Sequence, residues 1–237
     1  MTSRLLELQD LLFAWPGTRQ NYLAISEFHL NRGETLFLHG PSGCGKSTLL
    51  SLLAGVLLPH TGDVSLLGIP WKALPATERD RYRVDHLGYI FQQFNLLTYL
   101  TALDNVLLPC HFSTRRREAA KHHAGSARKA AEYWLQGMGL DESIWQRPAH
   151  KLSVGQQQRV AAARALIGQP DLVIADEPTS ALDEDSRAVF LDLLLSSCAA
   201  ADTALVFVSH DHRIASRFSR QISLPSINQA LHNEVPG

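Results

Sequence analysis

Residues 40–48 read Gly40-Pro41-Ser42-Gly43-Cys44-Gly45-Lys46-Ser47-Thr48, a match to the glycine-rich phosphate-binding loop pattern. The β-rich run ETLFLHG ends at Gly40, and the helical stretch STLLSLLAGVL follows Lys46. Glycines let the backbone turn its N–H groups toward phosphate oxygens, and the beginning of a helix adds partial positive charge. The stretch therefore predicts a strand–loop–helix unit that binds the phosphates of a nucleotide.

Side chains at the end of this loop have predicted contacts with the nucleotide. Lys46 is expected to reach the β- and γ-phosphates, Ser47 to bind Mg²⁺, and Thr48 to contact the α-phosphate. We interpret Cys44 as a small filler inside the loop, with a redox-sensitive thiol as the alternative. For the pattern as a whole, the alternative is a glycine-rich turn without a ligand.

A second stretch, LVIADE at residues 172–177, has the pattern of a buried strand that ends in two carboxylates. Asp176 can hold the Mg²⁺ bound by Ser47, and Glu177 can polarise water for attack on the γ-phosphate. Such a run can also be only a strand and its turn. Its position about 130 residues after the phosphate loop favours the catalytic interpretation.

Short β-rich runs alternate with longer helical patterns along the chain. The β-rich runs are ETLFLHG, DVSLLG, LGYIFQ, DLVIADE and TALVFVSH. Strands separated by helices predict a parallel α/β core with ligands at the carboxyl ends of the strands. Residues 101–155 are instead rich in helix formers, which predicts an inserted helical lobe. We interpret His122 and His123 within it as solvated helix surface, because no spaced cysteine or carboxylate ligands accompany them.

Composition narrows the class of protein. The 237 residues are 45% hydrophobic, and 22 basic residues nearly balance 23 acidic ones, so nucleic acid is not an expected partner. Three cysteines without metal-like spacing favour a reducing, cytosolic compartment. The N-terminus has no signal-peptide pattern, and the longest apolar stretch, LLSLLAGVLL, is about half of a membrane span. Any membrane role is therefore expected to need a partner.

The stretch Leu152-Ser153-Val154-Gly155-Gln156, followed by QQRVAAARAL, resembles the signature motif and helix of ABC (ATP-binding cassette) ATPases. Other parts of the family's pattern stand around it in the family's order, from residue 13 to residue 211. They are Trp15 in FAWPG at the place of the adenine-stacking aromatic, Gln92 in YIFQQFN as the Q-loop glutamine, Asp183 in SALD as the D-loop aspartate, and His210 in VFVSHD as the switch histidine.

Taken singly, these residues have simpler interpretations. Trp15 could be an ordinary core residue, Gln92 a polar loop residue and His210 a helix cap. Asp183 could be the N-cap of the helix DEDSRAVFLDLLL, where acidic residues are favourable. The order and spacing of the motifs favour the family interpretation.

The resemblance implies an α/β fold: a P-loop NTPase (RecA-like) core with an antiparallel β portion and an inserted helical subdomain. We expect one nucleotide-binding domain over residues 1–237. Its core would comprise about residues 1–95 and 160–237, and its helical subdomain about residues 96–159.

The resemblance also implies a mechanism that uses ATP and Mg²⁺. Two copies would face each other head to tail, and each ATP would lie between the phosphate loop of one copy and residues 153–156 of the other. Glu177 would be the general base, His210 would hold the γ-phosphate, and Gln92 would sense Mg²⁺. The homodimer would drive an integral-membrane permease from the cytoplasmic face of the inner (plasma) membrane.

The stretches GYIFQQFNLLTYLTALDNVLLP and LSVGQQQRVAAARAL resemble most the lipoprotein-release and macrolide-efflux branch of the family. One alternative is an ATPase of the cell-division type, which regulates a membrane partner without transport. Another is a soluble cassette of DNA repair or translation, although the expected long coiled coil, zinc modules or second cassette do not occur.

This sequence departs from the family pattern in two places. Val154 replaces the usual first glycine of the signature and adds a side chain near the predicted γ-phosphate contact. The tail QISLPSINQALHNEVPG has no glycine turn after its last strand, so the resemblance transfers no function beyond about Phe218.

Overall fold

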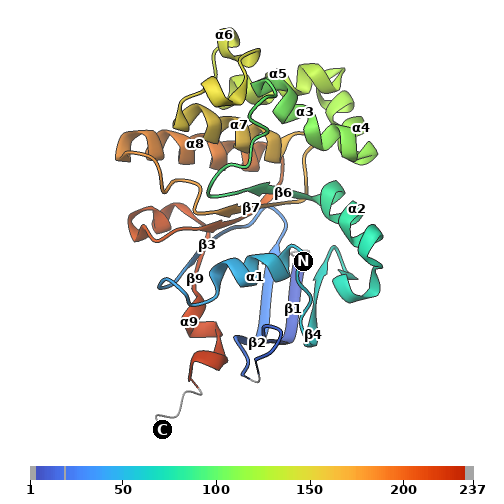
Figure 1. Ribbon diagram of the computed structural model, residues 1–237, viewed down its shortest axis with the longest axis vertical. Helices are drawn as coiled ribbons and strands as arrows, with labels where there is room; N and C mark the ends of the chain where they lie inside the picture. Colours follow the sequence, from blue (N-terminus) through green and yellow to red (C-terminus); the bar gives the residue numbers. More distant parts are fainter. Residues whose placement is uncertain (1–3, 19, 233–237) are drawn as a thin grey trace. The chain divides into compact units, whose positions relative to one another are not determined.

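The computed structural model describes residues 4–18 and 20–232. The chain divides into two compact units, a terminal unit (Met1–Arg83 and Val206–Gly237) and a central unit (Val84–Leu205). Figure 1 labels most of their helices and strands. Residues 233–237 of the tail lie outside the described residues.

The terminal unit contains an antiparallel sheet with the strand order β2-β1-β4-β5. Its strands are β1 (Arg4–Phe13), β2 (Leu23–Asn31), β4 (Thr61–Leu66) and β5 (Ile69–Pro70). The run DVSLLG forms β4, which pairs antiparallel with β1 through Leu8 and Val64. Our prediction of a parallel strand there is therefore wrong. Val64 and Leu66 are buried and alternate with partly exposed Ser65, the pattern of a strand with one buried face.

A parallel strand pair is also present in the terminal unit. The strands β3 (Thr35–His39) and β9 (Arg220–Ser223) pair in parallel. Leu36 lies opposite Arg220 at one end and His39 opposite Ser223 at the other. The apolar centre of β3, residues 36–38, is fully buried, as expected for a strand covered on both faces. The other elements of this unit are η1 (Trp71–Ala73), α1 (Lys46–Leu53), η3 (His212–Arg217), α9 (Leu224–Ile227) and η4 (Gln229–His232).

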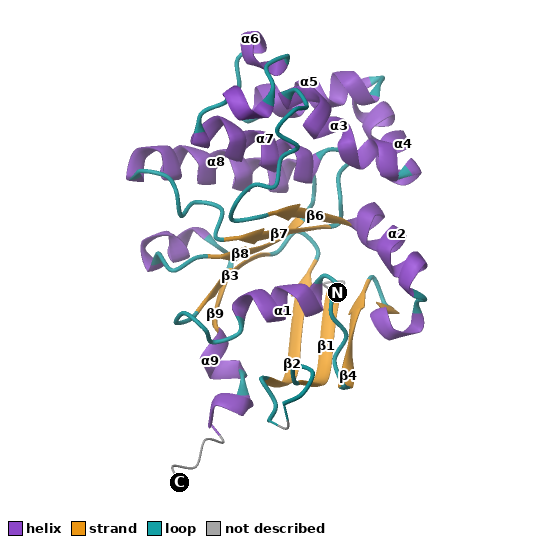
Figure 2. Cartoon of the chain, viewed as in Figure 1, coloured by secondary structure: helices purple, strands orange, loops and turns teal. Residues whose placement is uncertain are grey.

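The central unit combines parallel strands with helices, as shown by secondary structure in Figure 2. Strands β6 (Leu87–Ile90) and β7 (Leu172–Asp176) pair in parallel, with Ile90 opposite Ala175. Its helices are α3 (Ala102–Phe112), α4 (Thr114–Ala124), α5 (Ala127–Gly137), α6 (Glu142–Trp145), η2 (Ala149–Lys151), α7 (Val154–Leu166) and α8 (Glu184–Ala200). The helix α2 (Ala76–His86) and the strand β8 (Ala204–Val208) each span a boundary between the units.

Helices α3 to α6 confirm the helical character predicted for residues 101–155. Their boundaries follow local capping: Thr101, Ser113 and Ser126 are N-caps whose hydroxyls accept backbone N–H bonds at the starts of α3, α4 and α5. Helix α4 ends at Ala124, and its C-cap Gly125 has φ 82°. His122 and His123 are exposed on α4, as expected.

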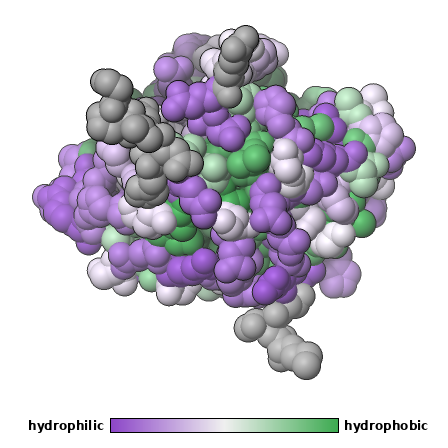
Figure 3. Space-filling model, turned by 90° about the horizontal axis from the view of Figure 1, so that it is seen from below, coloured by the Kyte–Doolittle hydropathy of each residue, from purple (hydrophilic) through white to green (hydrophobic). Residues whose placement is uncertain are grey.

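The surface drawn in Figure 3 is mainly hydrophilic, with apolar side chains in separate areas. None of the helices formed by residues 4–18 and 20–232 is both long and apolar enough to cross a membrane.

Arg116 of α4 is buried, with 2% of its surface exposed, although the surrounding sequence TRRRE suggests a solvated helix. Its guanidinium donates to the carbonyls of Ile167 (Nε, 2.8 Å) and Ala165 (Nη2, 2.6 Å). Ala165 lies in the last turn of α7 and Ile167 is its C-cap, where the carbonyls of a helix lack internal donors and carry partial negative charge. Burial lowers the pKa of Arg116 to about 10, so the guanidinium is still charged at neutral pH.

We predict that Arg116→Met lowers the free energy of unfolding by about 2 kcal/mol, because buried carbonyls at the end of α7 lose their donors. The neighbouring Arg117→Met is the matched control. Arg117 is partly exposed and pairs only with Glu118 and Thr114 in the described structure, so its loss should cost less than about 0.5 kcal/mol. Urea unfolding of the full chain measures both, and equal losses would contradict the helix-end role.

Candidate functional site

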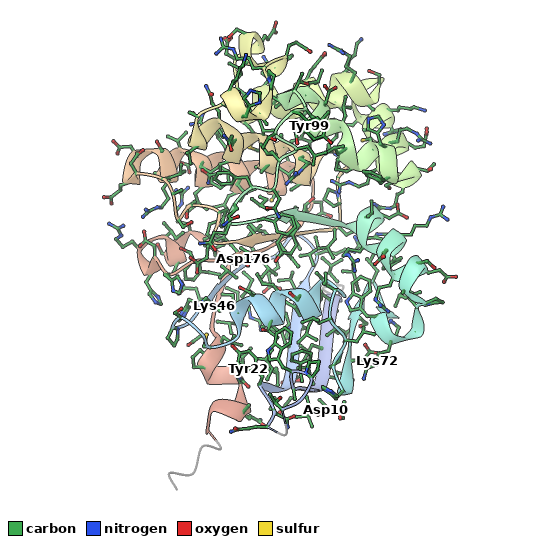
Figure 4. All side chains as sticks on the ribbon, in the orientation of Figure 1. Asp10, Tyr22, Lys46, Lys72, Tyr99 and Asp176 are labelled. Carbon is green, nitrogen blue, oxygen red and sulfur yellow. The ribbon has the colours of Figure 1, made fainter. Side chains whose placement is uncertain are left out.

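The phosphate loop lies in the terminal unit between β3 and α1. Lys46, the first residue of α1, is buried, and its Nζ donates to the carbonyls of Gly40 (2.9 Å) and Pro41 (3.0 Å). Ser47 is exposed and Thr48 is buried. The lysine thus crosses the loop from its end to its beginning, and Figure 4 labels it at the start of α1.

Two glycines of the loop have no room for a side chain. Gly45 has φ 102°, and a Cβ there would lie 2.9 Å from Leu23 Cδ2 and 3.3 Å from Tyr22 Cε1. At Gly40 a Cβ would lie 2.7 Å from Sγ of Cys44, which is buried inside the loop. This packing favours the interpretation of Cys44 as a filler.

Trp15 lies in the terminal unit and is 42% exposed, so its interpretation as a core residue is wrong. It lines a pocket of about 360 Å³ together with Tyr22, Gly43 and Ala230, and also Thr18, Gln20 and Asn21. This volume is within the range of small-molecule sites. The tryptophan is held by Phe13, whose ring meets it edge-on at 5.2 Å. An exposed indole beside the phosphate loop can stack on a nucleotide base.

The exposed side chain of His210 follows β8 and Ser209. It is not the cap of the next helix, because Asp211 is the N-cap of η3. Two residues farther on, His212 meets His39 edge-on, with 4.4 Å between ring centroids. His39 ends β3 directly before Gly40, so this ring pair connects the beginning of the phosphate loop with the segment after His210.

The central unit brings Asp176, Glu177 and Gln92 to one sheet edge. Strands β6 and β7 end next to each other, with Ile90 opposite Ala175. Asp176 is the last residue of β7, Glu177 follows it directly, and Gln92 follows the end of β6. Asp176 and Glu177 are partly buried, Gln92 is exposed, and Glu177 has φ 46°. Figure 4 labels Asp176. Burial, and secondly the charge of Asp176, raises the pKa of Tyr89 on β6, which keeps that phenol protonated.

Arg164 of α7 fixes the loop after Gln92, a role that we did not predict from the sequence. Its guanidinium donates to the carbonyls of Phe94 (2.6 Å) and Asn95 (2.6 Å), both of which have positive φ. Burial lowers the pKa of Arg164 to about 10, so it remains a cation at neutral pH. The loop of Gln92 is therefore bonded directly to the signature helix.

Residues 153–156 form the beginning of α7. Ser153 is its N-cap, and a capping box joins Ser153 Oγ to the Gln156 N–H (3.3 Å) and the Gln156 side chain to the Ser153 N–H (3.0 Å). Val154 is 47% exposed and helical. A Cβ at Gly155 would meet only Leu182 Cδ2, at 3.8 Å.

Asp183 is the N-cap of α8, and its carboxylate accepts from the Ser186 N–H at 2.8 Å. Hydrogen bonds from Ser186 lower the pKa of Asp183. The predicted cap is thus confirmed, and it is compatible with a second role because the residue is exposed.

The predicted site residues fall into two groups. The terminal unit holds Trp15, residues 40–48 and His210, and the central unit holds Gln92, residues 153–156, Asp176, Glu177 and Asp183. Within the part of the chain that the structure describes, no group of three or more His, Cys, Asp or Glu side chains could hold a metal ion.

The sequence profile described as "ABC transporter" matches residues 23–180. The chain belongs to the ABC transporter family. It is an ATP-binding and ATP-hydrolysing subunit of this family, with a P-loop NTPase fold.

Individual relatives agree with this family. The lipoprotein-releasing system ATP-binding protein LolD of Hydrogenovibrio crunogenus is 42% identical over 209 residues, which are 88% of this chain and 87% of the relative. An uncharacterized ABC transporter ATP-binding protein of Escherichia coli, YbbA, is 41% identical over 209 residues, which are also 88% of this chain and 87% of the relative. The predicted resemblance to the lipoprotein-release branch is therefore confirmed.

A solved cassette has the same fold. The dimeric post-hydrolysis structure of the ATP-binding cassette MJ0796, bound to ADP and Pi, superimposes with a TM-score of 0.78 at 33% identity. The alignment covers 95% of each chain.

The ring pair of His39 and His212 generates a pH dependence. Burial, and then the charge of His212, lowers the pKa of His39. The unfolded chain consequently takes up a proton more readily than the folded one, and the free energy of unfolding falls as the pH drops below about 6.5.

We predict that the free energy of unfolding falls less between about pH 7 and pH 5 in the His39→Asn variant than in the unsubstituted chain. Urea unfolding at both pH values measures the difference, with His122→Asn on the exposed face of α4 as the control. An unchanged pH dependence in His39→Asn would show that His39 does not contribute.

Proposed function

We propose that this chain is the motor subunit of an envelope transporter of the lipoprotein-release type. Two copies form a head-to-tail dimer that traps two ATP molecules and drives an integral-membrane permease from the cytoplasmic face of the inner (plasma) membrane. The observation that carries this proposal is the exposed beginning of α7, where Ser153 and Val154 face away from their own chain's core.

That helix end is suited to a nucleotide supplied by a second copy. Backbone N–H groups and the positive end of the helix favour an anion such as a γ-phosphate. The fold similarity to dimeric MJ0796 supports a dimer, and symmetric pairs are the commonest oligomers.

In the proposed reaction, Lys46 and the loop N–H groups hold the phosphates of ATP, and Trp15 stacks on the adenine. A water molecule attacks the γ-phosphorus while its bond to the bridging oxygen of ADP breaks. Glu177 accepts the water proton, and His210 orients the γ-phosphate and the water.

We further propose that Ser47, Gln92 and Asp176 hold Mg²⁺. Their hydroxyl, amide and carboxylate oxygens are the hard ligands that this ion prefers, and Ser47 and Gln92 are exposed. When bound, the ion would neutralise charge on the phosphates.

Coupling to the permease would start at Gln92. Its loop is bonded to α7 through Arg164, so a shift of this loop acts on the helix that carries the signature residues. In many nucleotide-driven switches, a segment is held in place by the γ-phosphate and is released when that phosphate is hydrolysed.

We predict that Glu177→Gln slows ATP hydrolysis by about 10²- to 10⁴-fold while ATP binding is retained, because only the general base is lost. Glu142→Gln on the exposed helix α6 is the control and should hydrolyse ATP normally. Turnover by Glu177→Gln close to that of this control, measured in the complex with the permease, would exclude Glu177 as the base.

The composite site predicts complementation between two inactive variants. Lys46→Ala and Ser153→Arg each damage both sites of a pure dimer, whereas a mixed dimer collects both defects in one site and leaves the other whole. Differently tagged subunits allow the mixed dimer to be isolated, and we expect it to recover partial ATPase activity. Activity no higher than that of the pure variants would contradict either the shared site or the independence of the two sites.

A further inference from the structure

The C-terminal tail packs against the first residue of the phosphate loop. Strand β9 pairs with β3 up to Ser223 opposite His39, which brings α9 next to Gly40. A Cβ at Gly40 would lie 3.0 Å from Pro225 Cδ and 3.7 Å from Leu224 Cβ. Leu224 is fully buried, so this contact is part of the core of the terminal unit.

Asn228 fastens the tail to the beginning of β2. The side chain is fully buried, and its Oδ1 accepts from the N–H groups of Ala24 (2.9 Å) and Ala230 (3.2 Å). Its Nδ2 donates to the carbonyl of Tyr22 at 3.2 Å. A buried amide with these partners is costly to remove, because each partner would lose a hydrogen bond away from water.

Tyr22 continues this connection into the phosphate loop. Its hydroxyl donates to the carbonyl of Gly43 at 2.7 Å, and its ring lies 3.3 Å from the Cβ position of Gly45. The backbone of Tyr22 is thus held by the tail, and its side chain holds two glycines of the loop. Figure 4 labels Tyr22 and Lys46.

The tail also reaches the pocket of Trp15. Ala230 lines it together with Trp15, Tyr22 and Gly43, and its position is fixed by its own N–H bond to Asn228. The tail therefore contacts both the predicted phosphate site and the predicted adenine site.

We propose that the C-terminal tail is a working part of the nucleotide site and that Asn228 is its positioning residue, acting through Tyr22 on the phosphate loop and through Ala230 on the pocket of Trp15. This inference rests on the proposed function, because it takes these two places as the phosphate and adenine sites. The described contacts of the tail are with the phosphate loop and the pocket of Trp15, where the nucleotide would bind, so its loss should raise KM for ATP and leave kcat nearly unchanged.

Binding of ADP with Mg²⁺ to the full chain, measured by isothermal titration calorimetry, tests the proposal without hydrolysis. We expect Asn228→Ala and Tyr22→Phe each to weaken ADP binding about fivefold, the size of one lost hydrogen bond. Gln229→Ala is the matched control. It lies next to Asn228 in the tail but bonds only Ser26 Oγ in the described structure, and it should bind ADP normally.

A double variant separates positioning from general weakening of the fold. If Asn228 acts through Tyr22, adding Asn228→Ala to Tyr22→Phe should weaken ADP binding much less than fivefold further. Effects that multiply in the double variant would overturn the proposed action of Asn228 through Tyr22. If Asn228→Ala does not fold, Tyr22→Phe alone decides, and ADP affinity equal to that of the unsubstituted chain would overturn the proposal.

Trp15→Ala and Lys46→Ala keep this test distinct from that of the proposed function. If neither weakens ADP binding, the predicted nucleotide site itself is wrong, and the inference falls with it. If both weaken it while Asn228→Ala and Tyr22→Phe do not, the site stands and only the role of the tail is overturned.

Discussion

The absence of a side chain at Gly45 is the constraint on which the nucleotide site depends. Its backbone has a positive φ and lies against Tyr22 and Leu23, so β2 supports the loop from one side. A Cβ at this position would displace either that strand or the loop. Helix α1 begins at the next residue, and Lys46 then bonds back to the carbonyls at the loop's beginning. The curvature of the phosphate loop, the position of α1 and the direction of the Lys46 side chain therefore depend on the packing at Gly45.

The remaining chemistry is supplied by a different part of the chain. The central unit carries the carboxylates of Asp176 and Glu177 at the end of β7. In the same unit, Arg164 bonds the loop after Gln92, the Q-loop, to α7. Arg116 bonds the same C-terminal end of this helix, next to Arg164. Helix α7 is thus bonded to the loop that carries Gln92 and anchored at its C-terminal end, while Ser153 caps its exposed beginning. A helix held in this way can transmit a displacement of the Q-loop to its other end.

Local patterns predicted the parts of the site that depend on local backbone chemistry. The glycine loop, the strand before Asp176 and the Asp183 cap are each encoded within about ten residues. Long-range contacts were not predictable in this way. Arg116 lies in a basic run typical of a solvated face, and Asn228 bonds Ala24 across 204 residues. The strand at residues 61–66 was predicted to be parallel, but its partner β1 lies far from it in the sequence, and a short β-rich run does not carry the direction of such a pairing.

The fold of this chain does not require a glycine at either Val154 or Gly155, the first two residues of α7. Val154 and Gly155 are both helical, and neither has a positive φ, so their backbone can accept a side chain. A Cβ at Gly155 would make only an ordinary contact with Leu182. Because glycine in a helix costs about 0.5–1 kcal/mol relative to alanine, Gly155 is unfavourable for this chain alone. In the dimer that we propose, the small size of Gly155 would leave room for the nucleotide held by the second copy. The proposed nucleotide of the second copy would then approach Gly155 more closely than Val154, because Val154, the first residue of the helix, carries an exposed side chain.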